Sequence, residues 1–285
     1  MFDLKELGRN VHQITLKTTG KNWEQWFLLS SDWHWDNPKC DRALLTKHLN
    51  QAKERNAGIF GFGDLLCLMQ GKYDPRGTKS DIRPEHNRSD YLDVVIRDLA
   101  QYLIPYKQNM ILYARGNHET NIRKRLETDP VERVVERVNV AHGGRAIYSG
   151  GYGGWLRFHF HTHTSRQSIN LKYFHGSGGG GVVTKGAIQQ QRIAASVEGA
   201  DIVYMGHVHE HGYKNFPKEL LSPDGEVKIK NSISLRGSTY KEEYGDGFGG
   251  WHIERGAPPK PLGSWWLRFF KQSQKKVGFE WIPTT

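Results

Sequence analysis

The sequence predicts an α/β layered fold, and three observations lead to this prediction. Short apolar runs alternate with amphipathic stretches through the first half of the 285-residue chain, as strands and helices do in layered α/β folds. Shorter apolar runs separated by turn residues dominate the second half, which indicates mixed or antiparallel sheet. The composition, with 37% hydrophobic and 25% charged residues, excludes a disordered chain and supplies enough apolar side chains for a core.

The first half contains three expected strands, each followed by an expected helix. The strands cover residues 26–31, 58–63 and 110–114, and the helices cover residues 38–55, 90–106 and 129–138. In the first helix, Leu45, Leu49 and Ala52 recur at helical spacing and form one apolar face. Asp129 and Pro130 open the third helix as its N-cap and first helical residue.

The second half is expected to contain more strands than helices. Strands are expected at residues 155–161, 170–174 and 201–205, a helix at 185–197, and shorter candidate strands at 227–235, 250–254 and 265–270. We expect one domain over residues 1–285, with a β-rich C-terminal part at 212–285. The polar stretch at 70–90 is long for a connection, so we interpret it as an insertion or a mobile loop.

Charge and cysteine content limit the partners and the compartment. The formal charge is +10 at neutral pH; a positive surface attracts polyanions such as nucleic acid, although basic surfaces also serve solubility. The two cysteines, Cys40 and Cys67, are too few for a disulfide framework, which agrees with a reducing compartment. No apolar stretch reaches the roughly 18 residues of a membrane span, and the first residues lack the pattern of a signal peptide. We therefore expect a cytoplasmic protein without a membrane partner, and the sequence leaves the oligomeric state open.

Five short polar motifs each stand at the end of an expected strand. In chain order they are Asp32-Trp33-His34, Gly63-Asp64, Gly116-Asn117-His118-Glu119, His175-Gly176 and Gly206-His207-Val208-His209. Loops beyond the carboxyl ends of strands are where α/β folds place ligands. Carboxylates, an amide oxygen and imidazoles are ligands that Mn²⁺, Fe, Zn²⁺ and similar ions accept. We expect both side chains of an i, i+2 pair, such as Asp32 with His34, to project to the same side of a strand end.

Each motif alone also has a structural interpretation. Gly-Asp is usually a turn, Gly-Asn-His is compatible with a loop whose Asn is left-handed, and a single histidine is often a buried structural side chain. Residues 159–163 contain three histidines and are a rival source of the single-histidine ligand. We favour His175, because it ends an apolar strand and precedes a glycine. All five motifs in this order, each after an apolar run, favour a metal site over chance.

This set of motifs resembles the calcineurin-like metallophosphoesterase superfamily, whose pattern runs Asp-x-His, Gly-Asp-x-x-Asp, Gly-Asn-His-Asp/Glu, His and Gly-His-x-His. The resemblance covers residues 32–209. It implies a four-layer αββα sandwich, in which two mixed sheets pack face to face with helices outside.

The resemblance also implies a role for each motif residue. Asp64 would bridge two divalent metal ions, and His118 would lie near the scissile phosphate as a general acid or a transition-state stabiliser. One ion would be bound by Asp32, His34 and His209, and the other by Asn117, His175 and His207. The chain departs from the pattern at Cys67, which stands where the family has the second acid of Gly-Asp-x-x-Asp. In some members that acid orients the histidine equivalent to His118; here Glu119 or another carboxylate is a candidate substitute.

We therefore expect a metal-dependent phosphoesterase that hydrolyses phosphate esters with a water activated by two cations. The ions are expected to be Mn²⁺, with Fe, Zn²⁺, Ni²⁺ and Mg²⁺ as alternatives. The charge and the aromatic content favour a phosphodiesterase or nuclease that acts on DNA, RNA or nucleotides. Two alternatives remain open: a phosphomonoesterase that acts on proteins or small molecules, and a non-catalytic metal-binding scaffold.

Overall fold

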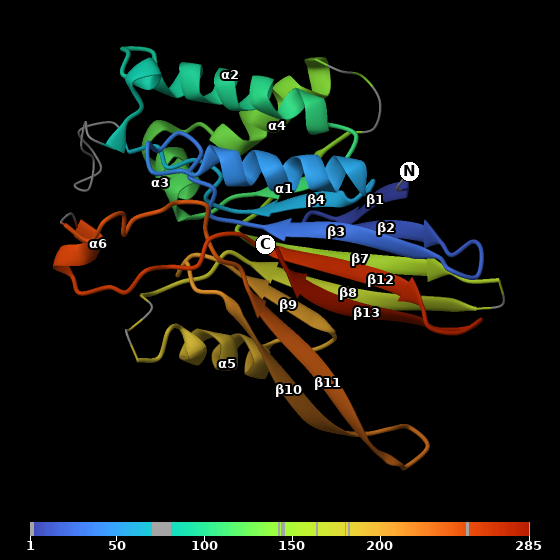
Figure 1. Ribbon diagram of the computed structural model, residues 1–285. Helices are drawn as coiled ribbons and strands as arrows, with labels where there is room; N and C mark the ends of the chain where they lie inside the picture. Colours follow the sequence, from blue (N-terminus) through green and yellow to red (C-terminus); the bar gives the residue numbers. More distant parts are fainter. Residues whose placement is uncertain are drawn as a thin grey trace.

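The structure is a computed structural model. It describes residues 3–69, 81–141, 143, 146–163, 165–179, 181, 183–248 and 251–284. Two sheets lie face to face and carry helices on their outer faces, which gives four layers (Figure 1). This confirms the expected αββα sandwich. Among the described residues, no helix is both long enough and apolar enough to cross a membrane.

One sheet has six strands and contains the central parallel strands of the first half. Its order is β13 (Val277–Pro283), β12 (Trp265–Lys271), β3 (Glu24–Ser30), β4 (Gly58–Phe62), β5 (Met110–Ala114) and β6 (Tyr148–Gly150). Strands β3 to β6 are parallel, whereas β12 pairs antiparallel with both β3 and β13. The four parallel strands therefore all end at the same edge.

The other sheet has seven strands of mixed direction. Its order is β1 (Asp3–Gly8), β2 (Val11–Lys17), β7 (Gly153–His161), β8 (Arg166–Phe174), β9 (Ile202–Met205), β11 (Val227–Arg236) and β10 (Gly212–Leu221). Strands β8, β9 and β11 are mutually parallel, and the long hairpin of β10 and β11 extends away from the body (Figure 1).

The helices occupy the two outer layers. Helices α1 (Arg42–Glu54), α2 (Tyr91–Leu103), α3 (Asn117–Leu126) and α4 (Pro130–Ala141) lie on the six-stranded sheet, and α5 (Ala187–Ser196) lies on the seven-stranded sheet (Figure 1). Their apolar faces pack on the sheet: Leu45, Val95 and Val135 share one buried cluster with Ile59 of β4. The remaining helical segments are short, namely η2 (Pro84–His86), η3 (Ile104–Tyr106) and α6 (Trp251–Glu254).

A second buried cluster, rich in aromatic side chains, fills the space between the sheets. Phe27 of β3 lies at its centre, with ring centroids 4.9 Å from Phe158 of β7 and 5.7 Å from Phe60 of β4. Close contacts of this kind across two sheets fix how the sheets stack. This core therefore fixes the strand ends of the six-stranded sheet in position relative to those of the seven-stranded sheet.

Truncation of Phe27 is expected to destabilise the fold by about 3–5 kcal/mol, because Phe27→Ala would leave a cavity among buried rings. Urea unfolding followed by circular dichroism measures the loss. Phe248→Ala is the matched control, since Phe248 is 94% exposed and its truncation should change stability by less than about 0.5 kcal/mol. Equal stability of the two variants would contradict this view of the core.

Most of the expected elements are present, with boundaries shifted by a few residues, and the exceptions have physical reasons. Residues 250–254, expected as a strand, contain the short helix α6, because so short an apolar segment carries no decisive periodicity. The Gly-Asn-His motif, considered as a loop, opens helix α3. Strands β1, β2, β6, β10 and β13 were not individually expected, although β2 alternates buried and half-buried residues. Of the expected insertion at 70–90, residues 70–80 lie outside the described residues, and the rest contains η2.

The C-terminal part is β-rich. Its four strands divide between the sheets, since β10 and β11 extend the seven-stranded sheet and β12 and β13 extend the six-stranded one. The last quarter of the chain thus completes both sheets that the earlier segments begin.

Candidate metal centre

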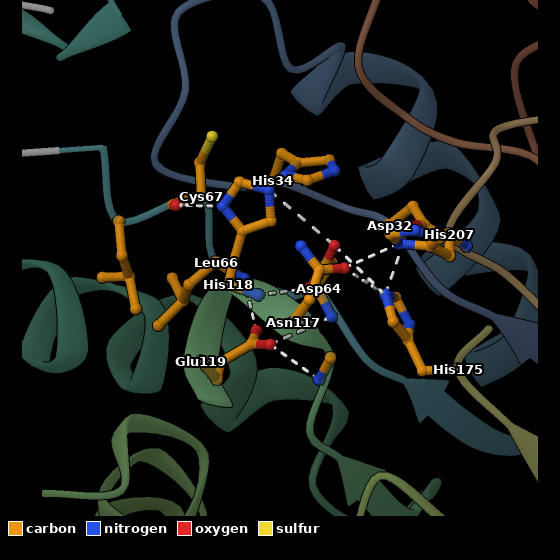
Figure 2. Close-up of polar contacts among 12 residues, drawn as sticks. Asp32, His34, Asp64, Leu66, Cys67, Asn117, His118, Glu119, His175 and His207 are labelled. Atoms are coloured by element: carbon orange, nitrogen blue, oxygen red, sulfur yellow. Dashed lines mark hydrogen bonds and ion pairs between the residues drawn. The ribbon is translucent and has the colours of Figure 1, made fainter. Parts of the chain in front are cut away.

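All five motifs lie just beyond the carboxyl ends of parallel strands. Asp32 and His34 follow β3, Asp64 follows β4, and Asn117 follows β5. The remaining three expected ligands come from the other sheet: His175 follows β8, and His207 and His209 follow β9. Figure 2 shows side chains of both groups pointing toward one another. Residues up to 177 positions apart in the sequence therefore meet at one edge of the sandwich.

Left-handed backbone places these side chains. Among the described residues, nine non-glycine residues have positive φ, and five of them are expected ligands: Asp32, His34, Asp64, His207 and His209. Such conformations cost of order 1 kcal/mol or more each and are concentrated at functional sites. Asp32 and His34 do turn to the same side, where both belong to one group of ligand atoms. Their backbone has left the strand, with φ values of 53° and 48°, so this turn rather than strand alternation brings them together.

Two motif glycines are required by close packing. A Cβ on Gly116 would collide with the carboxylate of Asp64, and a Cβ on Gly206 would collide with the carboxylate of Asp32. Neither of these glycines has the positive φ that would by itself call for glycine. They allow backbone segments to approach the two buried acids, which explains the glycines that precede Asn117 and His207 in their motifs.

The first group of ligand atoms consists of Asp32, His34 and His209. The Nε2 atoms of His34 and His209 are 3.2 Å apart, and Nε2 of His209 lies 3.4 Å from Oδ1 of Asp32. Asp32 is fully buried, and both of its oxygens accept hydrogen bonds from the backbone N–H of His207. The three ligand atoms lie within 4.8 Å of one another, a spacing that allows them to hold one cation.

The second group contains Asp64, Asn117, His175 and His207. Nε2 of His175 lies 3.2 Å from Oδ2 of Asp64 and 3.1 Å from Oδ1 of Asn117, and that amide oxygen lies 2.7 Å from Nδ1 of His207. His175 also lies 4.0 Å from Asp32 of the first group. The two groups are therefore adjacent, with Asp64 and His175 on the side that faces Asp32.

The charge states of these groups suit a cation. Burial, and then the neighbouring His118, hold the pKa of His34 well below its ordinary value, and burial lowers the pKa of His207 as well. Burial opposes ionisation of Asp64, but the adjacent imidazoles outweigh it and hold its pKa well below the usual range. Neutral imidazoles and ionised carboxylates are the forms that bind divalent ions.

His175 differs, because it pairs with the carboxylates. Its burial disfavours the charged form, yet Asp64 and Asp32 outweigh this effect and raise the pKa of His175 to about 10. Its Nδ1–H donates to the carbonyl of Phe62 at 3.0 Å, which points Nε2 at the centre. A divalent ion would take the place of the Nε2 proton, so binding is expected to release that proton.

His118 lies beside the ligand groups and is held by backbone. Its own N–H donates to Oδ1 of Asp64 at 3.0 Å, and its Nε2 lies 3.9 Å from Oδ2 of Asp64. Its Nδ1 lies 2.5 Å from the carbonyl oxygen of Cys67 (Figure 2). Because a carbonyl only accepts hydrogen bonds, Nδ1 carries a proton and Nε2 is the atom that faces the centre.

Glu119 does not orient His118, which corrects one of the candidates for that role. Its carboxylate accepts hydrogen bonds from the backbone N–H groups of Asp64, Leu66 and Gly116, at 2.8–3.1 Å. Glu119 is fully buried and joins the loop after β4 to the first turn of α3. Its function in the structure is to hold two motif loops together.

Cys67, His34 and His118 form a third group within ligand distance of one another. Burial raises the pKa of the Cys67 thiol far above its ordinary value, so the sulfur keeps its proton in this structure. The amide of Asn37 also lies 3.3 Å from the sulfur. Cys67 is thus a packed thiol, and its backbone carbonyl is the group that reaches His118.

The histidines of residues 159–163 are not brought to the centre. His159 and His161 lie on β7, where their rings are 4.8 Å apart and His159 contacts the hydroxyl of Ser168 on β8. Their neighbours in β7, Phe158 and Phe160, point into the core between the sheets, so these two histidines lie on the outer face. The structure brings His175, and not this rival segment, to the ligand groups.

Three polar residues near the centre had not been predicted. Asp36 is buried behind the loop that contains Cys67. Oε2 of Glu243 lies 3.8 Å from Nδ1 of His209, and its Oε1 lies 2.6 Å from Nζ of Lys241. Asp36 continues the alternation of Asp32 and His34 at a spacing of two, a signal that was available in the sequence. Glu243 follows no motif, so only the fold reveals its position beside His209.

Comparisons with known proteins identify distant structural likenesses. No protein-family model matches the chain, and no curated protein matches it. The chain is similar to a conserved uncharacterized protein from Streptococcus pneumoniae TIGR4, a predicted phosphoesterase, with 13% identity and a TM-score of 0.33 over 92% of this chain and 99% of that one. It is also similar to Chaetomium thermophilum Vps29, with 9% identity and a TM-score of 0.36 over 92% and 98% of the two chains.

A third solved structure with likeness to this chain is GAP50 of Plasmodium, the anchor in the inner membrane complex. It has 10% identity and a TM-score of 0.42, over 91% of this chain and 84% of that one. At such identities and TM-scores, none of the three likenesses supports a conclusion about activity. The chemistry must be inferred from the residues of the centre.

Proposed function

We propose that this chain is a calcineurin-like metallophosphoesterase, which binds two divalent cations and hydrolyses phosphodiesters. One observation carries the proposal: two adjacent groups of ligand atoms, each within 4.8 Å, are built from Asp32, His34 and His209 and from Asp64, His175 and His207. The amide oxygen of Asn117, in contact with His175 and His207, completes the second group. Asp64 is the proposed bridge between the two ions.

The chemistry of these donors fits divalent cations. Asp32 and Asp64 are buried, and their described partners are imidazoles and backbone N–H groups rather than lysine or arginine side chains. Two buried negative charges in such surroundings are costly unless cations offset them. The mixed oxygen and nitrogen donors suit Mn²⁺, our first choice, and also Fe, Zn²⁺, Ni²⁺ or Mg²⁺.

Bound divalent ions would supply Lewis acidity and would lower the pKa of a water molecule, so that its deprotonated form could attack phosphorus near neutral pH. The chain's own residues do the rest. Asp64 and Asp32 would hold the cations, and Gly116 and Gly206, which lack a Cβ, let the backbone pack closely against both acids. Nε2 of His118 points toward the same space, where it would donate a proton to the leaving oxygen or stabilise the charge that develops there.

A polyanionic diester is favoured as substrate over a small phosphate ester by the charge of the chain. Lysines and arginines number 40 and acidic residues 30, so the surface attracts polyanions. Helix α3 begins in the centre and exposes Arg123, Lys124 and Arg125 in its last turn, about 10 Å along its axis. We propose that these side chains contact phosphates near the one being cleaved, which would favour DNA, RNA or oligonucleotides as substrates.

The deciding experiment measures hydrolysis of bis-p-nitrophenyl phosphate and of p-nitrophenyl phosphate by protein loaded with Mn²⁺, before and after chelation. Cleavage of the diester, lost on chelation and restored by Mn²⁺, is the expected result. A labelled single-stranded oligonucleotide then tests nuclease activity and its dependence on salt.

The other outcomes identify the two alternatives. Cleavage of the monoester alone would assign the centre to a phosphomonoesterase. Stoichiometric metal binding without cleavage of either substrate would assign it to a metal-binding scaffold. Failure to bind any divalent ion would refute all three functions.

A further inference from the structure

His118 lacks the carboxylate that the family pattern places three residues after Asp64, and the structure contains a different device in that position. The backbone carbonyl oxygen of Cys67 lies 2.5 Å from Nδ1 of His118 and accepts a hydrogen bond from the Nδ1–H group (Figure 2). A backbone carbonyl can fix the orientation of an imidazole only if the peptide group that contains it is itself held in place. What holds residues 67 and 68 therefore determines where Nε2 of His118 points.

Asp36 holds these two peptides. Its Oδ1 accepts the N–H of Cys67 at 2.5 Å, and its Oδ2 accepts the N–H of Leu68 at 2.9 Å. Oδ2 also accepts the hydroxyl of Tyr91 from α2, at 2.7 Å. Asp36 is 1% exposed and Tyr91 7% exposed, so water does not compete for these bonds. A buried carboxylate with three donors is a strong and rigid anchor.

The backbone at this anchor is strained, which makes the anchor necessary. Leu68 has a positive φ of 53°, an unfavourable conformation for a bulky side chain. A strained turn persists only where surrounding interactions over-determine it, and the two bonds from Cys67 and Leu68 to Asp36 do so. Without them, the peptide after Leu66 would relax and the Cys67 carbonyl would move away from His118.

We propose that Asp36 is a positioning residue for His118, which acts through the Cys67 carbonyl and replaces the missing acid of the motif. The expected effect of Asp36 on the reaction rate rests on the proposed function. Its effect on the orientation of the His118 imidazole does not depend on activity. Asp36 touches neither ligand group through the hydrogen bonds described for it, so it is expected to govern His118 without changing the metal ions.

The test is a double-mutant cycle of Asp36→Asn and His118→Asn, measured as kcat on bis-p-nitrophenyl phosphate with Mn²⁺. An asparagine offers one acceptor oxygen where the carboxylate offers two, so one peptide N–H loses its partner. Misplacement of His118 by about 1 Å is expected to lower kcat by up to about 100-fold. If Asp36 acts through His118, the double variant is as slow as His118→Asn alone. Losses that multiply, or an Asp36→Asn protein with wild-type kcat, would overturn the proposal.

Two further variants keep the test decisive. Tyr91→Phe removes one donor to Asp36 and is expected to slow catalysis in the same direction by a smaller factor. If the Asp36→Asn protein does not fold, Tyr91→Phe takes its place in the double-mutant cycle. A wild-type kcat of the Tyr91→Phe protein would then overturn the proposal. Asp201→Asn is the matched control, because Asp201 also binds a backbone N–H, that of Asn170, at the far end of β9. It should leave kcat and Mn²⁺ binding unchanged.

NMR of protein with ¹⁵N-labelled histidine separates failure of this proposal from failure of the proposed function. The wild-type protein should show His118 protonated at Nδ1 and hydrogen-bonded, and Asp36→Asn should lose this signature while Mn²⁺ titration stays unchanged. An unaltered His118 signal in Asp36→Asn would refute the positioning role even in a protein with no measurable activity. If the wild-type protein is inactive but Asp36→Asn still loses the wild-type His118 signature, the positioning role stands and the phosphoesterase function is refuted.

Discussion

Asp64→Asn is expected to lower kcat/KM for a phosphodiester by about 10³-fold or more and to leave at most one tightly bound cation per chain. The carboxylate is the only acid of the second ligand group, and it is also the proposed bridge to the first. An amide is neutral and has one acceptor oxygen, so it cannot serve both ions. Several kcal/mol of transition-state stabilisation from a metal ion correspond to a factor of this size.

Metal content by mass spectrometry and steady-state kinetics with Mn²⁺ measure this effect. Asp41→Asn is the matched control, because Asp41 caps α1 through the N–H of Leu44 and asparagine caps helices equally well. Two ions and undiminished hydrolysis in Asp64→Asn would refute the proposed centre. Loss of one ion in the Asp41→Asn protein would show that the method, and not the ligand, is responsible.

His118→Asn is expected to lower kcat by about 10²–10⁴-fold while two cations remain bound. His118 contacts Asp64 through its backbone N–H, an interaction that the variant keeps, and its imidazole is held by the Cys67 carbonyl. The substitution therefore removes the imidazole of the proposed acid and leaves both ligand groups in place.

The identity of the leaving group distinguishes the two roles given to His118. If its Nε2 donates a proton, the loss should be larger for diphenyl phosphate than for bis-p-nitrophenyl phosphate, because phenolate is the poorer leaving group. If it stabilises charge on the phosphate, the two losses should be equal. A His118→Asn protein with wild-type kcat on both substrates would remove His118 from the reaction.

The local sequence was sufficient to predict most of the elements and the strand ends at which the candidate ligands lie. Buried strands such as β4 and β5 are continuous apolar runs, and the apolar face of α1 is visible as a helical repeat. Each polar motif begins where such a run ends, and the carboxyl ends of parallel strands meet at one edge. Asp32, Asp64 and His175 could be identified for this reason, without knowledge of the strand order.

Signals in the sequence are weak where residues gain their partners from distant segments. Strand β1 is mostly exposed and is a strand because it pairs with β2. Its own residues barely distinguish it from a loop. The helix α6 is four residues long, too short for periodicity to separate it from a strand. Glu243 lies 34 residues after His209 in the chain, and only the path of β10 and β11 brings it back beside that imidazole.

The types of ligand and their order are thus properties of the sequence, because they depend on side-chain chemistry and on where apolar runs end. The tertiary structure decided what orients them. The sequence shows that an acid is missing at Cys67, and it offers Glu119 or another carboxylate as a candidate replacement. The fold instead gives His118 a backbone carbonyl held by Asp36, since peptide groups carry no sequence signal and become specific partners only once the chain has folded.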